Sequence, residues 1–196
     1  MAELFYPSGD VPLYPLPTAG NPSGLAGGDR EMVPVVDEKG VVIGEAGREW
    51  VHGGSALLHP VVHIHIINHG GEFYLQKRAP GKDLYPGYWD TAVGGHVDFG
   101  ETVAEALFRE ASEELGLSGI NPVYLETYIY ESESEREWVN VFALVGDFCP
   151  KPDAGEVSEG RYWTASEIEA AAGTGVFTPN FESEFARLRE KIEALL

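Results

Sequence analysis

The alternation of apolar and polar positions predicts short strands in the first half of the chain. Met32–Val36 is apolar, a turn follows, and VVIGEA continues the pattern, which is typical of a β-hairpin. His59–Asn68 and Glu72–Arg78 are rich in β-branched and aromatic residues and flank a glycine turn, so they predict a second strand pair. Residues 79–89 are interrupted by proline and glycine and are expected to form a loop.

Helical spacing begins after Gly100. Apolar residues then recur at three- and four-residue steps as far as Leu115, and Gly116 is a natural helix end. Beyond it we expect two strands on either side of an acidic loop over 131–137, then a short strand and two helices. Their predicted bounds are Pro122–Tyr130, Trp138–Phe148, Arg161–Thr164, Ala165–Ala172 and Phe181–Leu196. Because strands and helices mix without regular β-α alternation, the pattern predicts an α+β sandwich.

The first 31 residues differ from the rest of the chain. The first 30 residues contain five prolines and five glycines, so neither a helix nor a long strand is expected there. We interpret 1–31 as an N-terminal arm and 32–196 as the folded domain. The arm is either loosely ordered or packs Phe5, Tyr6 and Tyr14 onto its own domain or a partner's.

Composition narrows the class of protein. The chain has 196 residues, of which 43% are hydrophobic, and a net charge of −19. This charge argues against binding a nucleic acid polymer or an anionic membrane surface. The one cysteine, Cys149, excludes an internal disulfide and an all-cysteine zinc site. The chain shows neither a secretory signal pattern nor a membrane-spanning apolar stretch, so we predict a cytoplasmic enzyme that does not associate with membranes.

Three glutamates project from one face of the helix predicted after Gly100. Glu110, Glu113 and Glu114 stand at i, i+3 and i+4, where like charges repel one another. A divalent cation such as Mg²⁺ or Mn²⁺, which prefers carboxylate oxygens, would remove that repulsion. From these three residues alone, a solvated acidic face explains the pattern equally well.

The spacing of the surrounding segment favours the metal site. Residues 95–117 read G-x5-E-x7-R-E-U-x-E-E-x-G-U, in which U is an apolar residue. The specified residues are Gly95, Glu101, Arg109, Glu110, Ala111, Glu113, Glu114, Gly116 and Leu117. The segment resembles the Nudix box, the signature of the Nudix hydrolases. This resemblance implies an α/β/α sandwich with a mixed sheet between helices, and Mg²⁺- or Mn²⁺-dependent hydrolysis of a nucleoside diphosphate linked to another group.

The same resemblance implies roles for individual residues. Glu110, Glu113 and Glu114 match the metal ligands, and the carbonyl of Gly94 matches a further ligand. Arg109 is expected to hold Glu101 or a ligand carboxylate by a bidentate bond, although Glu101 could itself join the metal shell. The general base often lies outside the box. Our candidates are Glu137 and Glu156, which could equally be solvated glutamates in or beside acidic loops.

The flanking segments resemble one branch of this fold, the isopentenyl-diphosphate isomerases. LLHPVVHIHII, QKRAPGKDLYPGYWDTAVGGH and EREWVNVF carry the likeness, which covers about residues 33–165. The resemblance implies a metal site at His52, His59, His96, Glu135 and Glu137, and diphosphate contacts by Arg78 and Lys82. The isomerase's catalytic cysteine, however, is replaced by Gly94. We therefore favour a hydrolase, with the isomerase and a non-catalytic Nudix-fold binding module as alternatives.

Some assignments stay open at this level. The three histidines either assemble a second metal site with Glu135 and Glu137 or are remnants of ancestry. Tyr88, near the site, either stacks on a substrate ring or packs its loop. The expected partner is a small-molecule diphosphate, and the sequence leaves a homodimer open.

Overall fold

The centre of the molecule is a seven-stranded mixed sheet. The computed structural model describes residues 18–24, 31–82, 84–153 and 155–196. The main path of the sheet has the order β10-β5-β4-β9-β8. These strands are β10 (Val157–Thr164), β5 (Glu72–Arg78), β4 (Leu58–Ile67), β9 (Arg136–Val145) and β8 (Val123–Glu131). β4 and β9 run parallel, and the other neighbours on this path are antiparallel.

Two short strands extend the sheet beside the candidate site. β6 (Trp89–Asp90) pairs with β5, and β7 (Val93–His96) pairs with β4. Neither strand is predicted by the apolar pattern, because glycine and short length leave no alternation to detect. Their positions depend on pairing with distant strands, which a local pattern does not contain.

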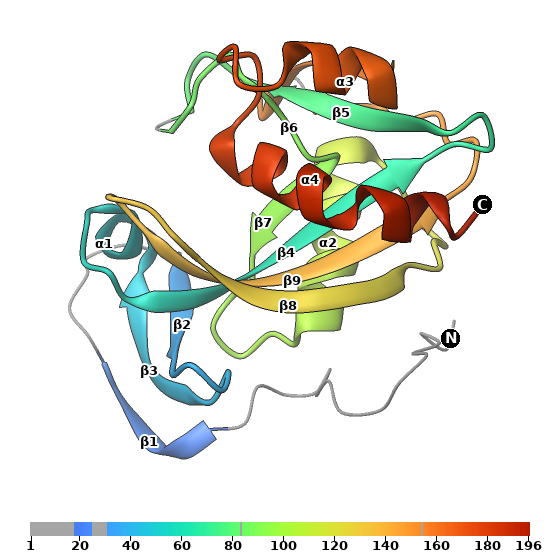
Figure 1. Cartoon of the computed structure of the whole chain (residues 1–196). Helices are drawn as coiled ribbons and strands as arrows, with labels where there is room; N and C mark the ends of the chain where they lie inside the picture. The colour runs from blue at the N-terminus through green and yellow to red at the C-terminus, as the bar shows by residue number, and fades with distance from the viewer. Residues whose placement is uncertain (1–17, 25–30, 83, 154) are drawn as a thin grey trace.

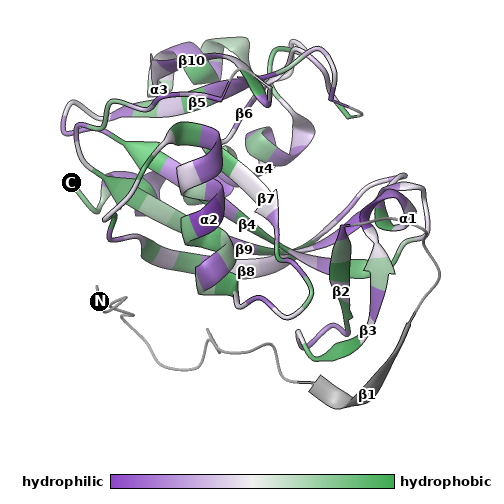
Figure 2. Ribbon diagram, turned by 180° about the vertical axis from the view of Figure 1, so that it is seen from behind, coloured by the Kyte–Doolittle hydropathy of each residue, from purple (hydrophilic) through white to green (hydrophobic). Residues whose placement is uncertain are grey.

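Helices cover both faces of the sheet (Figure 1). α2 (Val103–Leu115) lies on one face, while α3 (Ala165–Ala171) and α4 (Pro179–Glu193) lie on the other. Each helix buries an apolar stripe against the strands, and Figure 2 shows the hydrophobic colouring concentrated in the central strands. The predicted α+β sandwich, with a mixed sheet between helices, is therefore confirmed.

β4 is buried on both faces, and its two faces differ in chemistry. Val62, Ile64 and Ile66 belong to the apolar core on the α2 side. The alternate residues His63 and His65 face α4, because side chains alternate along a strand, and both hydrogen-bond a residue of that helix. Both histidines are buried.

A second, three-stranded sheet contains the predicted hairpin. Its order is β1-β3-β2, with β1 (Thr18–Gly24), β3 (Val42–Gly47) and β2 (Met32–Val36). The five-residue helix α1 (Arg48–His52) follows directly and was not predicted. β1 is a seven-residue strand in the segment where we expected no long strand, because parallel pairing with β3 is a tertiary interaction that local propensity omits. Phe5, Tyr6 and Tyr14 lie outside the described residues, and the division at 31/32 stays a prediction.

Two strand boundaries change the interpretation of site residues. β9 begins at Arg136, so Glu137 lies within a strand, in register with His59, and the expectation of a loop position is wrong. β10 begins at Val157, four residues earlier than predicted, because it pairs with β5 over that length. α4 also begins earlier, at Pro179, where the Thr178 hydroxyl accepts from Phe181 N and caps the helix.

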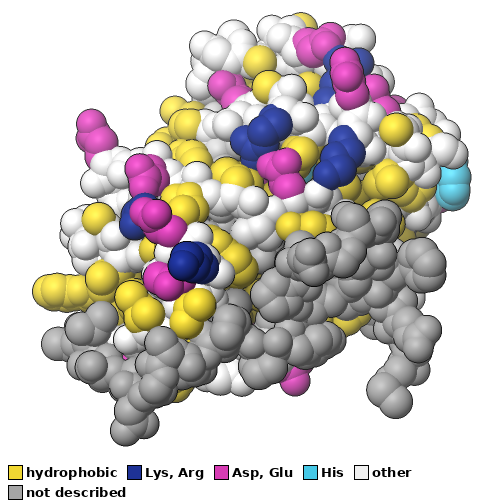
Figure 3. Space-filling model, turned by 60° about the horizontal axis from the view of Figure 1, so that its bottom comes forward, with side chains coloured by type: hydrophobic (Ala, Val, Ile, Leu, Met, Phe, Trp, Pro, Cys, Tyr) yellow, Lys and Arg dark blue, Asp and Glu magenta, His cyan; other side chains and the backbone are white. Residues whose placement is uncertain are grey.

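The described surface intersperses the two signs of charge. Arg187 pairs with Glu126 at 2.6 Å, and Arg136 pairs with Glu38 at 2.9 Å. Figure 3 shows acidic and basic side chains beside each other on the visible face. Among the described helices, none is both long and apolar enough to cross a membrane.

Candidate active site

The helix α2 carries the three candidate metal ligands, and both of its ends are fixed locally. Thr102 and Glu105 form a capping box at the N-terminus. At the C-terminus Gly116 adopts the left-handed conformation with φ of 63°, as the sequence predicts for a helix end at this residue. The register of the glutamates is therefore set within the segment itself.

The three glutamates differ in their surroundings. Glu114 is 5% exposed and accepts hydrogen bonds from Gly94 N at 3.2 Å and from Gln76 Nε2 at 3.1 Å. Burial and the nearby charge of Glu110 raise the pKa of Glu114 to about 8. Burial also raises the pKa of Glu110, whereas the side chain of Glu113 is largely exposed. Burial therefore opposes the negative charge of both carboxyl groups, and the charge of Arg109 offsets part of this effect at Glu110.

Arg109 connects these carboxylates. Its Nε and Nη2 atoms donate to the two oxygens of Glu101 at 2.9 and 2.8 Å, which is a bidentate pair. Nη1 also donates to Glu110 at 2.7 Å and to Glu113 at 3.2 Å, and Nη2 donates to the carbonyl of His96 at 2.9 Å. The guanidinium thus orients Glu110 and Glu113. Both carboxylate oxygens of Glu101 bind Arg109, as expected from the sequence.

Gly95 gives Glu110 its space. A methyl group at residue 95 would lie 2.5 Å from Cγ of Glu110 and closer still to its carboxyl group. The position therefore excludes any side chain while Glu110 keeps this conformation. Gly94 is different, because a methyl group there would make ordinary contacts at 3.6–3.8 Å with His63 and Thr91.

The donor set fits a hard divalent cation. Glu110, Glu113 and Glu114 stand at i, i+3 and i+4 on α2 and line one pocket, and Glu114 lies beside the backbone of Gly94. The buried Glu114 has only neutral hydrogen-bond donors among the described residues, and Oε1 of its partner Gln76 has no partner there. A cation at this point would compensate the buried charge.

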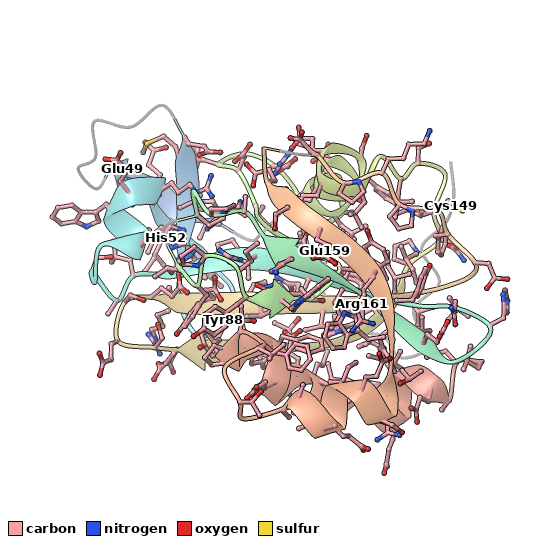
Figure 4. The ribbon with its side chains drawn as sticks, turned by 90° about the horizontal axis from the view of Figure 1, so that it is seen from above. Glu49, His52, Tyr88, Cys149, Glu159 and Arg161 are labelled. Atoms are coloured by element: carbon pink, nitrogen blue, oxygen red, sulfur yellow. The ribbon has the colours of Figure 1, made fainter. Side chains whose placement is uncertain are left out.

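A second cluster contains three histidines. Nε2 of His52 lies 2.9 Å from Nε2 of His96, and Nδ1 of His52 lies 2.7 Å from Glu135. One ring nitrogen from each of His52, His59 and His96 lies within 4.8 Å of the others. Figure 4 shows His52 projecting from α1, a helix that the sequence pattern did not predict.

Two of the three rings, His59 and His96, are favoured in the neutral form. Burial lowers the pKa of His59 to about 4, and burial together with the charges of His59 and His52 lowers the pKa of His96 well below its ordinary value. Nε2 of His59 is buried without a hydrogen-bond partner among the described residues. Neutral imidazoles with converging nitrogens fit a metal such as Zn²⁺ or Mn²⁺.

Glu137 lies apart from the three-histidine set. It is 8% exposed and accepts a hydrogen bond from Asn180 Nδ2 at 3.3 Å. Burial and the charge of Glu135 raise the pKa of Glu137 to about 8. Glu156, the other candidate base, is half-exposed and pairs with Lys82.

One pocket of about 410 Å³ connects most of the candidate residues. It is lined by the three glutamates of α2, by Glu135, Glu137 and Glu156, and by Arg78, Lys82, Arg109, Gly94, His52 and His96. Arg78 is held by Asp90 at 3.0 Å and by the carbonyl of Leu84 at 2.9 Å. Tyr88 does not line this pocket. It packs edge-on against Tyr85, which does, with 5.6 Å between the ring centroids.

The pocket also contains residues that the sequence analysis did not select. Gln76, Asn180 and His63 all line it. Behind them the fully buried Glu184 of α4 binds both His63 and His65. Burial lowers the pKa of His63, but the Glu184 carboxylate outweighs this effect and raises that pKa to about 9. One indication was present in the sequence, since Glu184 interrupts the apolar stripe of the terminal helix.

Comparison with known proteins agrees with this fold. A family model described as the NUDIX domain matches residues 57–181. An uncharacterised Nudix hydrolase of Streptomyces coelicolor is 32% identical over 168 residues, covering 85% of this chain and 92% of that protein. An isopentenyl-diphosphate Delta-isomerase of Streptomyces griseus is 31% identical over 170 residues, covering 84% of this chain and 86% of that protein.

Solved structures give the same result. A crystal structure of a Deinococcus radiodurans protein superposes with a TM-score of 0.67 at 26% identity, covering 83% of this chain and 99% of that one. A Nudix domain from Shewanella oneidensis, crystallised with ADP ribose, shares the fold with a TM-score of 0.57 at 13% identity, covering 67% and 86% of the two chains. The chain belongs to the Nudix family.

Proposed function

We propose that this protein is a metal-dependent hydrolase that cleaves the diphosphate bond of a nucleoside diphosphate derivative or a similar small molecule. One observation carries the proposal: Glu110, Glu113 and Glu114 line, together with Gly94, a pocket that also contains Arg78 and Lys82. The carboxylates suit Mg²⁺ or Mn²⁺, and the two basic side chains suit a diphosphate. We further expect a cytoplasmic protein that binds no nucleic acid polymer, with a homodimer left open.

The chain's residues have separable tasks in this reaction. Glu110, Glu113, Glu114 and the carbonyl of Gly94 would hold the metal. Once bound, such an ion neutralises the diphosphate and lowers the pKa of a coordinated water. Arg109 positions the carboxylates, while Arg78 and Lys82 bind the phosphates.

A general base must accept a proton from the attacking water. Glu137 and Glu156 both line the pocket. Glu137 is buried and its raised pKa suits proton uptake, whereas Glu156 would first have to release Lys82. Comparing kcat of Glu137→Gln and Glu156→Gln identifies the base, because the variant that lacks it loses kcat with little change in KM.

The histidine cluster supports a second proposal, namely that His52, His59 and His96 hold another metal with Glu135, which lies 2.7 Å from Nδ1 of His52. Glu137, expected with them from the sequence, lies apart from this set. Nε2 of His59 is the atom that favours it, since it is buried without a partner among the described residues. Metal analysis of purified protein tests it. Wild-type protein should retain Zn²⁺ or Mn²⁺ that a His59→Ala variant loses, and equal metal content in the two proteins would contradict the site.

A panel of diphosphates tests the hydrolase. Nucleoside triphosphates, dinucleotide pyrophosphates, nucleotide sugars and isopentenyl diphosphate would each be incubated with Mg²⁺ or Mn²⁺, and release of phosphate or pyrophosphate measured. Metal-dependent release supports the hydrolase. Tight ligand binding without release of phosphate or pyrophosphate from any compound would favour the non-catalytic module. Isomerisation of isopentenyl diphosphate would favour the isomerase, whose metal site the histidine cluster resembles.

A further inference from the structure

His63 presents one edge of its ring to the candidate pocket. It is 8% exposed, lines the pocket, and stands opposite Gly94 in the pairing of β4 with β7. Its Nδ1 atom lies 2.9 Å from Glu184, and the opposite edge faces Gly94, where a methyl group would lie 3.7 Å from Nε2. Nε2 forms no hydrogen bond with any described residue. It is also not among the fully buried polar atoms that lack a partner, so it is accessible from the pocket. Nε2 is therefore available to a ligand.

The ring is held from behind by a buried carboxylate. Glu184 is 0% exposed and accepts hydrogen bonds from His63, from His65 at 2.8 Å and from the Tyr128 hydroxyl at 2.6 Å. A buried carboxylate requires such donors. His65 supplies the same interaction but is 1% exposed and does not line the pocket. The two histidines thus share one partner and differ in access to the ligand.

The pocket needs donors for a polyanion. Its basic side chains are already paired with carboxylates: Arg48 with Glu31, Arg78 with Asp90, Lys82 with Glu156, and Arg109 with Glu101 and two glutamates of α2. A phosphate must compete with each of these carboxylates. The partner of His63 is on the far side of its ring, so Nε2 meets a phosphate oxygen without breaking an ion pair.

We propose that His63 is a substrate-contacting residue whose Nε2 donates a hydrogen bond to a phosphate oxygen of the bound diphosphate, while Glu184 orients its ring. This proposal rests on the proposed function, because it assumes a diphosphate in the pocket. A phosphate oxygen accepts, so Nε2 is the donor in this contact, while Nδ1 donates to Glu184. The bond to Glu184 holds the ring with Nε2 toward the pocket.

Two substitutions at residue 63 separate the two edges of the ring. The amide nitrogen of Asn reaches the place of Nδ1, so His63→Asn keeps the bond to Glu184 and loses the contact with the pocket. The longer Gln reaches the place of Nε2, so His63→Gln keeps a donor facing the pocket and loses the bond to Glu184. His65→Gln is the matched control, because His65 donates to the same carboxylate through Nε2.

We expect His63→Asn to raise KM about tenfold with kcat changed by less than about threefold, because loss of a hydrogen bond to a charged group affects binding of the ground state. KM of His63→Gln should lie nearer to wild type, although its thermal midpoint falls more. His65→Gln should leave KM unchanged. KM within about twofold of wild type in His63→Asn would overturn the proposal. Equal KM values for the two residue-63 variants, or an equal rise in His65→Gln, would also overturn it.

A binding measurement separates failure of this contact from failure of the hydrolase. If wild-type protein hydrolyses a diphosphate but His63→Asn matches it, only the contact is wrong. If wild-type protein hydrolyses nothing, calorimetry with methylenediphosphonate and Mg²⁺ still tests the contact. Weaker binding by His63→Asn than by wild type supports it, and equal binding or no binding by wild type refutes it.

Discussion

Gly95→Ala should inactivate the enzyme without unfolding it. The new methyl group would lie 2.5 Å from Cγ of Glu110, whereas ordinary contacts begin at 3.4 Å. The difference, 3.4 − 2.5 = 0.9 Å, is the least distance that Cγ must move, and the carboxyl group beyond it moves further. Because Glu110 is proposed to bind the metal, this displacement opens the metal site.

The expected loss of activity greatly exceeds the loss of stability. A misplacement of about 1 Å in a catalytic constellation costs on the order of 100-fold in rate. The folded variant loses the 2.7 Å hydrogen bond between Arg109 and Glu110, but Arg109 keeps its bidentate pair with Glu101. Since moving Glu110 outward also relieves its desolvation, we expect the free energy of unfolding to change by less than about 2 kcal/mol, as for one charge-assisted hydrogen bond.

The assay measures kcat/KM against Mg²⁺ concentration, together with the thermal midpoint. The neighbouring Gly94→Ala is the matched control, because a methyl group there makes only ordinary contacts and leaves the carbonyl in place. It should keep activity within about fivefold of wild type and the same metal dependence. Activity of Gly95→Ala equal to that of Gly94→Ala would refute the argument that this glycine exists to admit Glu110.

Four further outcomes follow from the site and the core. Glu113→Gln, or Glu114→Gln, should abolish metal-dependent turnover with an unchanged or higher thermal midpoint, because one repelling carboxylate is removed; activity within a fewfold of wild type would exclude these residues from the site. Arg78→Ala should raise KM strongly and steepen its dependence on Mg²⁺, and an unchanged KM would mean that the substrate enters elsewhere. Because Gly94 provides no thiol, product analysis should detect no interconversion of isopentenyl and dimethylallyl diphosphate. Leu107→Ala, at a fully buried position of α2, should lower the free energy of unfolding in urea by about 2–5 kcal/mol, and a loss below about 1 kcal/mol would contradict its place in the core.

The helix α2, which carries the candidate metal ligands, could be predicted because its determinants are local. Its apolar spacing, the Thr102–Glu105 capping box and Gly116 all lie within one segment, so its register follows from the sequence. The spacing of the surrounding motif then gives the expected metal ligands without knowledge of the fold.

The contacts of His63 and Gln76, which line the pocket, could not be predicted in the same way. His63 meets Glu184 across 121 residues, and Gln76 meets Glu114 across 38. No local pattern specifies which strand or helix faces another at such separations. A polar residue within an apolar stripe, as Glu184 is on α4, nevertheless indicates a buried partner, because an unpaired carboxylate there would be costly.

The pairing of β4 with β7 explains how one short segment positions three groups of the pocket. Three consecutive pairs join His63 to Gly94, Val62 to Gly95 and Val61 to His96. These pairs position three groups. They are the carbonyl of Gly94, which is the proposed metal ligand, the space at Gly95 that admits Glu110, and His96 of the second cluster. Because hydrogen-bonded strands are rigid compared with loops, these groups keep their separation, whereas the side chain of Glu113 is largely exposed. The motif therefore begins with glycine for a steric reason, since the strand must pass directly beneath the carboxylate of Glu110.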